Sequence, residues 1–272
     1  MTDYDPLIYR GSAAHYVRGR PPYSAALAST LAREDGLDGT GSLLDVGSGP
    51  GTVAIELAHM FETVTGIDPD SDMLTVARER APNILWIQAL AEDIPSLGLG
   101  PQRLVTFGQS FQWTDRERVA ETVYDLLQPG GSIAMIVHTV EDRAAPAVAP
   151  RGLPPIPHDE IREIVQRYLG PRRRSGAGFV RVPPDRYEDA LGRTRFGPPR
   201  HIFAPGRPDI VRDIESVLSG YFSLSTAAPH LFGDDLDAFA RDVRALLASR
   251  SETGEFWDWP GDTEIVIATK PG

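Results

Sequence analysis

The 272-residue sequence contains no cysteine. This absence excludes disulfide bonds, thiolate nucleophiles, zinc sites with thiolate ligands and iron–sulfur clusters. Lysine is almost as scarce, since Lys270 is the only one, and a single lysine near the end of the chain argues against Schiff-base or lysine-base chemistry. Nearly all positive charge is therefore arginine, a bias that we interpret as typical of a GC-rich genome.

Basic residues are fewer than acidic residues in this sequence. The chain has 27 Lys and Arg against 38 Asp and Glu, which gives a net charge of −11. Nucleic-acid binding requires a basic surface, so no nucleic-acid partner is expected. The sequence also lacks an apolar run of membrane-spanning length, and residues 1–20 lack the apolar segment of a signal peptide. We therefore expect a cytoplasmic protein without membrane contact.

The hydrophobic content of 41% is enough to form one large domain, and we expect residues 1–272 to be that domain. One stretch, residues 43–54, combines an apolar segment with closely spaced glycines. Its apolar part predicts a buried parallel strand. Gly47, Gly49 and Gly51 allow a sharp turn and close approach of the backbone to a ligand. A helix starting near Thr52 would offer unpaired N–H groups to a polar or anionic group.

The spacing of these glycines distinguishes two ligand classes. Dinucleotide enzymes use G-x-G-x-x-G, but here Thr52 stands where the third glycine of that pattern belongs. Asp45 precedes the first glycine by two residues and would repel a pyrophosphate but attract a cation. The resulting D-x-G-x-G-x-G resembles motif I of class I S-adenosylmethionine-dependent methyltransferases, whose cofactor carries an ammonium and a sulfonium. The resemblance makes the loop residues candidates for cofactor binding: Asp45, Gly47, Ser48, Gly49 and Gly51.

The second predicted strand, residues 64–67, ends at Asp68. A carboxylate at that position can accept hydrogen bonds from both ribose hydroxyls. Pro69 and Met73 would supply apolar surface against adenine, while Asp70 and Ser71 are better placed than Asp68 to cap the next helix.

A third strand is predicted over residues 84–88, and residues 89–95 after it resemble the family segment G-D-A-E-x-L-P. In relatives this loop holds the adenine edge, which implies a role for the Ala91 backbone N–H and for Glu92 or Asp93 nearby. The sequence departs from the pattern at Leu90, where the family often has an acidic residue. Glu92, Asp93 or water would then replace the usual contact with the adenine amine.

Residues 108–115 follow the fourth predicted strand, 104–107, at the sheet edge where open α/β sheets bind ligands. They resemble the Q-x-x-H-W-x-D segment of the type 11 group, which includes trans-aconitate-methyltransferase-like proteins. Gln109 and Ser110 are predicted to contact the cofactor or the methyl-transfer centre. Gln112 stands where the group frequently has histidine, and Trp113 is predicted mainly to pack.

The lead-in to the domain resembles a Y-x-x-x-R-P-x-Y segment that, in many small-molecule members of the family, folds over the cofactor. By that resemblance Tyr16 and Arg20 approach the methionine moiety, although a surface segment fixed by two prolines explains the pattern equally well. His138, at the end of the fifth predicted strand, is the first candidate for a base or orienting group. His15, together with Tyr16, is the second. No metal site is predicted, because the His, Asp and Glu residues show no metal-ligand spacing.

The family resemblance implies a Rossmann-like, doubly wound α/β sheet of seven strands with an antiparallel last strand, and a helical cap over the active site. We expect residues 1–33 to form an N-terminal lid and first helix, and 42–139 the cofactor-binding core. Residues 140–230 would form the cap and substrate region, with a helix near 209–218 and a possible sixth strand at 200–204. Residues 231–272 would supply the last helix and strand.

The predicted function is methyl transfer from S-adenosyl-L-methionine to a small molecule, with carbon, nitrogen and oxygen acceptors all open. The acidic charge and the apolar cap favour an aromatic or apolar acceptor, and the arginine bias suggests bacterial secondary metabolism, including methylation of an indole-type carbon. Two other classes stay open, a nicotinamide-dependent oxidoreductase and a non-catalytic cofactor-binding scaffold. The sequence does not define an oligomeric state.

Overall fold

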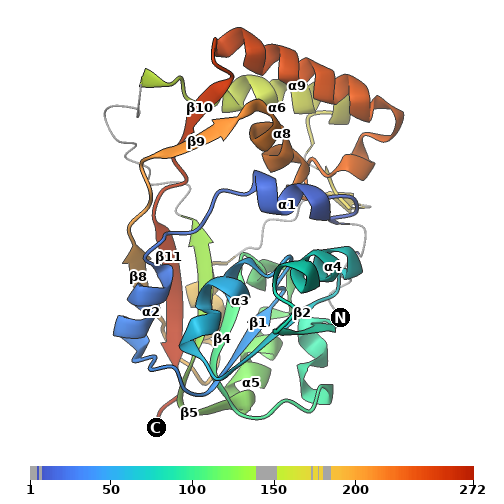
Figure 1. The fold of residues 1–272 in the computed structure, drawn as a ribbon. Coiled ribbons are helices and arrows are strands. Elements are labelled where there is room, and N and C mark those ends of the chain that lie inside the picture. Colours follow the sequence, from blue (N-terminus) through green and yellow to red (C-terminus); the bar gives the residue numbers. More distant parts are fainter. Residues whose placement is uncertain (1–4, 6–7, 139–151, 173, 177, 180–184) are drawn as a thin grey trace.

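The computed structural model of the chain describes residues 5, 8–138, 152–172, 174–176, 178–179 and 185–272. Its main sheet has seven strands in the order β3-β2-β1-β4-β5-β11-β8 (Figure 1). The strands are β1 (Ser42–Val46), β2 (Thr63–Asp68), β3 (Leu85–Gln88), β4 (Gln102–Gly108), β5 (Leu127–His138), β8 (Arg200–Ala204) and β11 (Thr263–Thr269). Strands β1 to β5 are parallel, and β11 runs antiparallel between β5 and β8. The predicted doubly wound sheet is confirmed, including its antiparallel last strand.

Helices cover both faces of this sheet. The helices of the core are α2 (Leu27–Asp35), α3 (Thr52–Leu57), α4 (Ser71–Arg80), α5 (Arg116–Leu126) and α7 (Tyr187–Gly192). Apolar side chains of α2 and α3 pack with one set of strand residues, and those of α5 and α7 pack with the alternate set. Because successive strand residues point to opposite faces, the near-continuous apolar strands supply both interfaces. The carboxyl ends of β1, β2, β4 and β5 are thereby held at one rigid edge.

A second hydrophobic cluster forms the cap above that edge (Figure 1). It joins α6 (His158–Leu169), α8 (Ile214–Phe222) and α9 (Leu236–Arg250) with the hairpin β9 (Ile210–Asp213) and β10 (Glu255–Asp258). Phe232 and Phe239 stack at its centre with ring centroids 4.1 Å apart. A separate two-stranded ribbon, β6 (Arg174–Ser175) and β7 (Gly178–Phe179), follows α6.

The cap does not coincide with the expected range 140–230, part of which lies outside the described residues. Within the described part, β8 is the sixth strand expected at 200–204, but α7 also belongs to the core, whereas α9 and β10 belong to the cap. The expected helix at 209–218 is also wrong at its start. Residues 210–213 are extended because they pair with β10, and the helix begins at Ile214 with the Asp213 side chain accepting from the Ser216 N–H.

The short helix α1 (Ala13–Gly19) lies between the cap and the core (Figure 1). It packs so closely on α8 that a Cβ at Gly19 would lie 2.2 Å from the backbone carbon of Ser219. On either side of this contact, the Ser12 hydroxyl donates to the Phe222 carbonyl at 2.7 Å, and Arg20 Nη2 donates to the Ser223 carbonyl at 3.0 Å. The N-terminal segment is thus attached to the cap by backbone packing as well as by side chains.

A buried ion pair completes this attachment. Arg212 on β9 and Asp258 on β10 are each 7% exposed, and their Nη1 and Oδ2 atoms are 3.1 Å apart. Arg212 Nη2 also donates to the Gly19 carbonyl at 2.6 Å and to the Ser216 carbonyl at 2.7 Å. One guanidinium therefore connects the hairpin, α8 and the end of α1.

Across the described ranges, none of the helices combines the length and the apolar composition that a membrane crossing requires.

Candidate cofactor and methyl-transfer site

The glycine loop between β1 and α3 has left-handed backbone at Gly47 (φ 64°) and Gly49 (φ 52°). A Cβ at Gly47 would lie 2.5 Å from Ser110 Cβ, whereas a Cβ at Gly49 would meet nothing within 4 Å. Ser110, at the end of β4, donates its hydroxyl to the Val46 carbonyl and so packs directly on the loop. The loop therefore needs glycine at 47 for packing, and it leaves open space at 49.

Two buried carboxyl groups lie beside this loop. Asp45 on β1 is 1% exposed and accepts from the Ala54 N–H at 3.1 Å and the Thr106 hydroxyl at 2.8 Å. Asp68 at the end of β2 is 7% exposed and accepts from the Gly49 N–H at 2.7 Å and the Asp70 N–H at 2.8 Å. Burial raises the pKa of Asp45 to about 7 and that of Asp68 to about 6, because desolvation disfavours the charged form more than these hydrogen bonds restore it.

Two cavities meet above the loop, under α1. The first has about 700 Å³ of empty space, some of it open to solvent, and the second has about 440 Å³. Both are lined by Tyr16, Gly47, Gly108 and Gln109, so they adjoin at that point. The first is lined by residues at the ends of β2 and β3, and the second by Arg20 and His138.

The structure brings most of the predicted site residues into these cavities. The first cavity is lined by Tyr16, Gly47, Gly49, Asp68, Pro69, Met73, Ala91, Glu92, Gln109 and Ser110. The second is lined by Tyr16, Arg20, Asp45, Gly47, Ser48, Gln109 and His138. Segments more than 120 residues apart in the sequence, such as those of Tyr16 and His138, thus converge on one cleft.

Three predicted residues line neither cavity. Gly51 lies under the Trp86 ring, whose nearest atom would be 2.5 Å from an added Cβ, so this glycine serves packing between helix and sheet. Asp93 accepts from the Leu90 N–H at 3.0 Å and caps its own turn. His15 faces the cap, with its Nδ1 3.4 Å from the Ser219 hydroxyl and its ring 4.9 Å from that of Phe222. Neighbouring residues on a helix point in different directions, so Tyr16 and His15 cannot both face the cleft.

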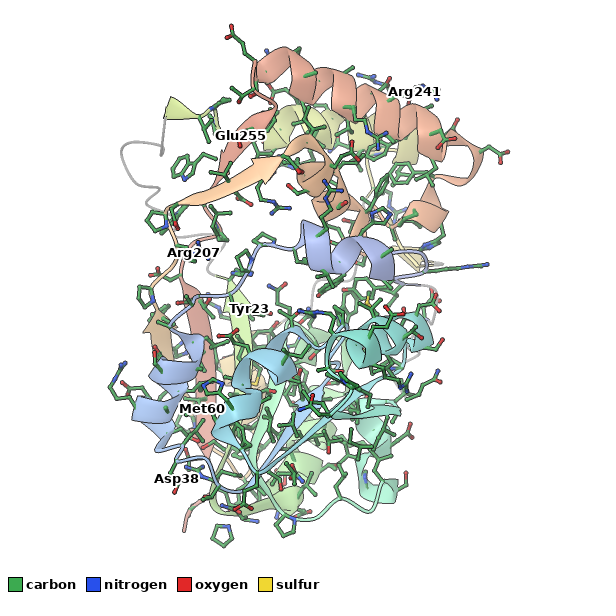
Figure 2. The ribbon with its side chains drawn as sticks, viewed as in Figure 1. Tyr23, Asp38, Met60, Arg207, Arg241 and Glu255 are labelled. Carbon is green, nitrogen blue, oxygen red and sulfur yellow. The ribbon has the colours of Figure 1, made fainter. Side chains whose placement is uncertain are left out.

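Two aromatic residues that were not predicted from the sequence as site residues, Tyr9 and Tyr23, also line the cavities. Tyr9 meets Tyr16 and Trp113 edge-on, with ring centroids 6.4 and 6.3 Å apart. Tyr23 stacks on His138 with centroids 4.7 Å apart and lies between sheet and cap (Figure 2). Tyr23 ends the Y-x-x-x-R-P-x-Y segment and could have been found from it. Nothing in the sequence singles out Tyr9, whose approach depends on the path of the chain over the core.

The residues present fit a zwitterionic nucleoside ligand. Arg20 has a buried Nε without a hydrogen-bond partner, and the described residues place no carboxylate within ion-pair distance of its guanidinium. The guanidinium carbon instead lies 4.9 Å from the Tyr16 ring centroid. A ligand carboxylate would satisfy this cation, while Asp68 offers acceptor oxygens to hydroxyl groups at the other end of the cleft. Among the described residues, no cluster of three or more His, Asp and Glu could hold a metal ion.

Part of the chain is similar to known methyltransferases. Residues 43–131 match a family model described as a methyltransferase domain. The chain is 29% identical over 141 residues to an uncharacterized methyltransferase of Mycobacterium tuberculosis, covering 50% of this chain and 54% of that protein. It is 33% identical over 145 residues to trans-aconitate 2-methyltransferase of Paracidovorax citrulli, covering 50% of each.

A solved structure described as a type II methyltransferase from Anaeromyxobacter dehalogenans has the same fold. It is 24% identical to the chain, covers 93% of it and 97% of its own length, and superposes with a TM-score of 0.52. The chain spans about half the length of the curated relatives it matches.

Residues 43–131 therefore match a methyltransferase domain, and the seven-stranded sheet that contains them has the fold of the class I, S-adenosylmethionine-dependent type. S-adenosylmethionine is the cofactor of this class, and it is the nucleoside zwitterion that the charges of the cleft suit. The match favours this class over the nicotinamide-dependent oxidoreductase that the sequence had left open.

Proposed function

We propose that the protein transfers a methyl group from S-adenosylmethionine to a small aromatic or apolar molecule. The observation that carries this proposal is the position of Asp68 and Arg20 at opposite ends of one covered cleft, with Tyr16 and Gln109 where its two cavities meet. The N-terminal segment that contains α1 lines the cleft opposite the glycine loop, which favours a small acceptor over a macromolecule. The aromatic rings of Tyr9 and Trp113 favour an apolar or planar one.

Each group of residues has a separate task in this proposal. Asp68 holds the ribose hydroxyls, Pro69 and Met73 supply apolar surface for the adenine, and Glu92 and the Ala91 N–H lie along its edge. Arg20 holds the ligand carboxylate, and the glycine loop admits the chain that joins it to the nucleoside. When bound, the cofactor supplies an activated methyl group. The protein aligns the acceptor with it and keeps water out.

His138 is the residue we assign to proton transfer for an acceptor that must lose a proton. It lies at the end of β5 in the second cavity, and its stacking on Tyr23 fixes the plane of the imidazole. Burial raises the pKa of Tyr23 far above its usual range, so this phenol stays neutral and does not compete as a base. Tyr16 remains a second candidate, because it lines both cavities.

We further propose that the setting is the bacterial cytoplasm and the pathway type secondary metabolism. The use of arginine for nearly all positive charge supports a bacterial source with a GC-rich genome. The net charge of −11 supports a partner other than nucleic acid.

Calorimetric titration with S-adenosylhomocysteine, run beside NADH, tests the proposal. We expect S-adenosylhomocysteine alone to bind, after which acceptors can be screened for a mass gain of one methyl group. Binding without methylation of any acceptor would favour the scaffold alternative. A folded protein that does not bind S-adenosylhomocysteine would contradict the proposal.

The affinity for S-adenosylhomocysteine is expected to depend on pH through Asp68. The ionised carboxylate can accept a hydrogen bond from each of the two ribose hydroxyls. The protonated carboxyl group has less acceptor capacity, and its O–H needs a hydrogen-bond acceptor of its own. Because the pKa of Asp68 is raised to about 6, the dissociation constant should fall about tenfold between pH 5 and pH 7. Calorimetry at both pH values measures this change. In Asp68→Asn most of it should disappear, and an unchanged pH profile in that variant would assign the dependence to another group.

A further inference from the structure

Gln109 has an unusual backbone conformation. Within the described part of the chain it is the one residue other than glycine with a positive φ, at 55°. The left-handed region costs free energy in a residue with a Cβ, and such residues persist only where the surroundings hold them. Gln109 also lines both cavities, at the point where they adjoin. The strained residue is therefore at the centre of the candidate site.

Two side chains outside the cavities hold this peptide. Gln112 Nε2 donates to the Gln109 carbonyl at 2.6 Å, and the Tyr187 hydroxyl donates to Gln112 Oε1 at 2.7 Å. The orientation of the Gln112 amide follows from the chemistry, because a backbone carbonyl can only accept and so requires the NH₂ group opposite it. The Gln109 N–H donates to the Ile136 carbonyl at 3.1 Å, which fixes the other side of the residue.

Tyr187 is itself fixed from several sides. It begins α7, and its ring meets Phe111 edge-on with centroids 5.9 Å apart. The Arg116 guanidinium lies 5.7 Å from the same ring and pairs with Asp185 at 3.2 Å. Neither Gln112 nor Tyr187 lines either of these two cavities, and their hydrogen bonds lead to the carbonyl of Gln109, which lines both.

We propose that Gln112 and Tyr187 are positioning residues that hold the Gln109 peptide in its left-handed conformation and thereby place the Gln109 carboxamide at the methyl-transfer centre. This inference rests on the proposed function. The carboxamide oxygen is a neutral acceptor that suits a sulfonium and the methyl group attached to it. S-adenosylhomocysteine lacks that methyl group and that charge. The ratio of the dissociation constants for S-adenosylmethionine and S-adenosylhomocysteine therefore reports the placement of Gln109.

Gln112→Glu is the sharpest variant, because it keeps the side-chain length and the acceptor for Tyr187 but removes the donor to the Gln109 carbonyl. We expect its dissociation constant for S-adenosylmethionine to rise at least threefold more than that for S-adenosylhomocysteine, as measured by calorimetry. Tyr187→Phe should change the ratio in the same direction by a smaller factor. Tyr124→Phe is the matched control, since Tyr124 packs on Phe196 beside α7 and lines neither cavity.

A second measurement distinguishes an effect on the position of Gln109 from a general disruption of the binding site. Glycine adopts the left-handed conformation without strain, and Gln109→Gly also removes the carboxamide. In that background, Gln112→Glu should leave the ratio within twofold. A proportional loss of affinity for both ligands, or an unchanged ratio in the folded single variants, would overturn the inference and leave the proposed function standing. Failure of the wild-type protein to bind either ligand would overturn both.

Discussion

Replacing Asp68 by alanine is expected to raise the dissociation constant for S-adenosylhomocysteine about 100-fold. The variant removes two carboxylate oxygens that we assign to the ribose hydroxyls, in a cleft where Asp68 is 7% exposed. A hydrogen bond to a charged group is worth about 1.5–3 kcal/mol, so a loss of about 3 kcal/mol in binding follows, at about 1.4 kcal/mol per tenfold change. Calorimetric titration of the folded variant measures it.

Asp70→Ala is the matched control for this prediction. Asp70 is two residues away and is the N-cap of α4, where its Oδ1 accepts from the Asp72 and Met73 N–H groups. Loss of this cap should cost about 1 kcal/mol of stability but leave the dissociation constant within about threefold. Wild-type affinity in a folded Asp68→Ala protein would remove the assignment of the ribose site.

Replacing Asp258 by alanine is expected to lower the free energy of unfolding by about 3 kcal/mol. The change leaves the Arg212 guanidinium buried without its carboxylate, and removing one member of a buried ion pair costs about 3–5 kcal/mol. We expect the lower end of this range, because Arg212 keeps its bonds to the Gly19 and Ser216 carbonyls. Urea unfolding followed by circular dichroism measures the difference.

The pair formed by Arg244 and Glu215 provides the comparison on the surface. Its side chains are 45% and 43% exposed, so Glu215→Ala should lower the free energy of unfolding by less than about 1 kcal/mol. Equal losses in the two variants would mean that burial does not decide the strength of the Arg212–Asp258 pair.

The core of the fold could be predicted because its signals are local. The glycine loop, the acidic residue ending β2 and the short apolar strands each occupy a few consecutive residues. The order of the strands then follows from the family pattern that these signals match. The cavity-lining positions of Asp68, Gln109 and His138 follow as well, because the ends of parallel strands share one edge.

The cap and part of the site could not be predicted, because they depend on contacts between distant segments. Residues 210–213 are extended only through pairing with β10, more than 40 residues later. The assignment of α9 to the cap rests on packing against α6 and α8. Similarly, the spacing in the lead-in segment could not show that Tyr16 faces the cleft and His15 the cap. The roles assigned to the individual site residues remain predictions.

The attachment of α1 has a mechanical consequence for ligand exchange. Helix α1 carries Tyr16 and ends just before Arg20. It packs on α8 through Gly19, and Arg212 of the β9–β10 hairpin donates a hydrogen bond to the Gly19 carbonyl. A ligand that binds to Tyr16 and Arg20 is therefore bound to a segment that is attached to the cap. We therefore expect such a ligand to leave when α1 separates from the glycine loop while remaining packed on α8, so that the contacts between α1 and the core set the rate of release.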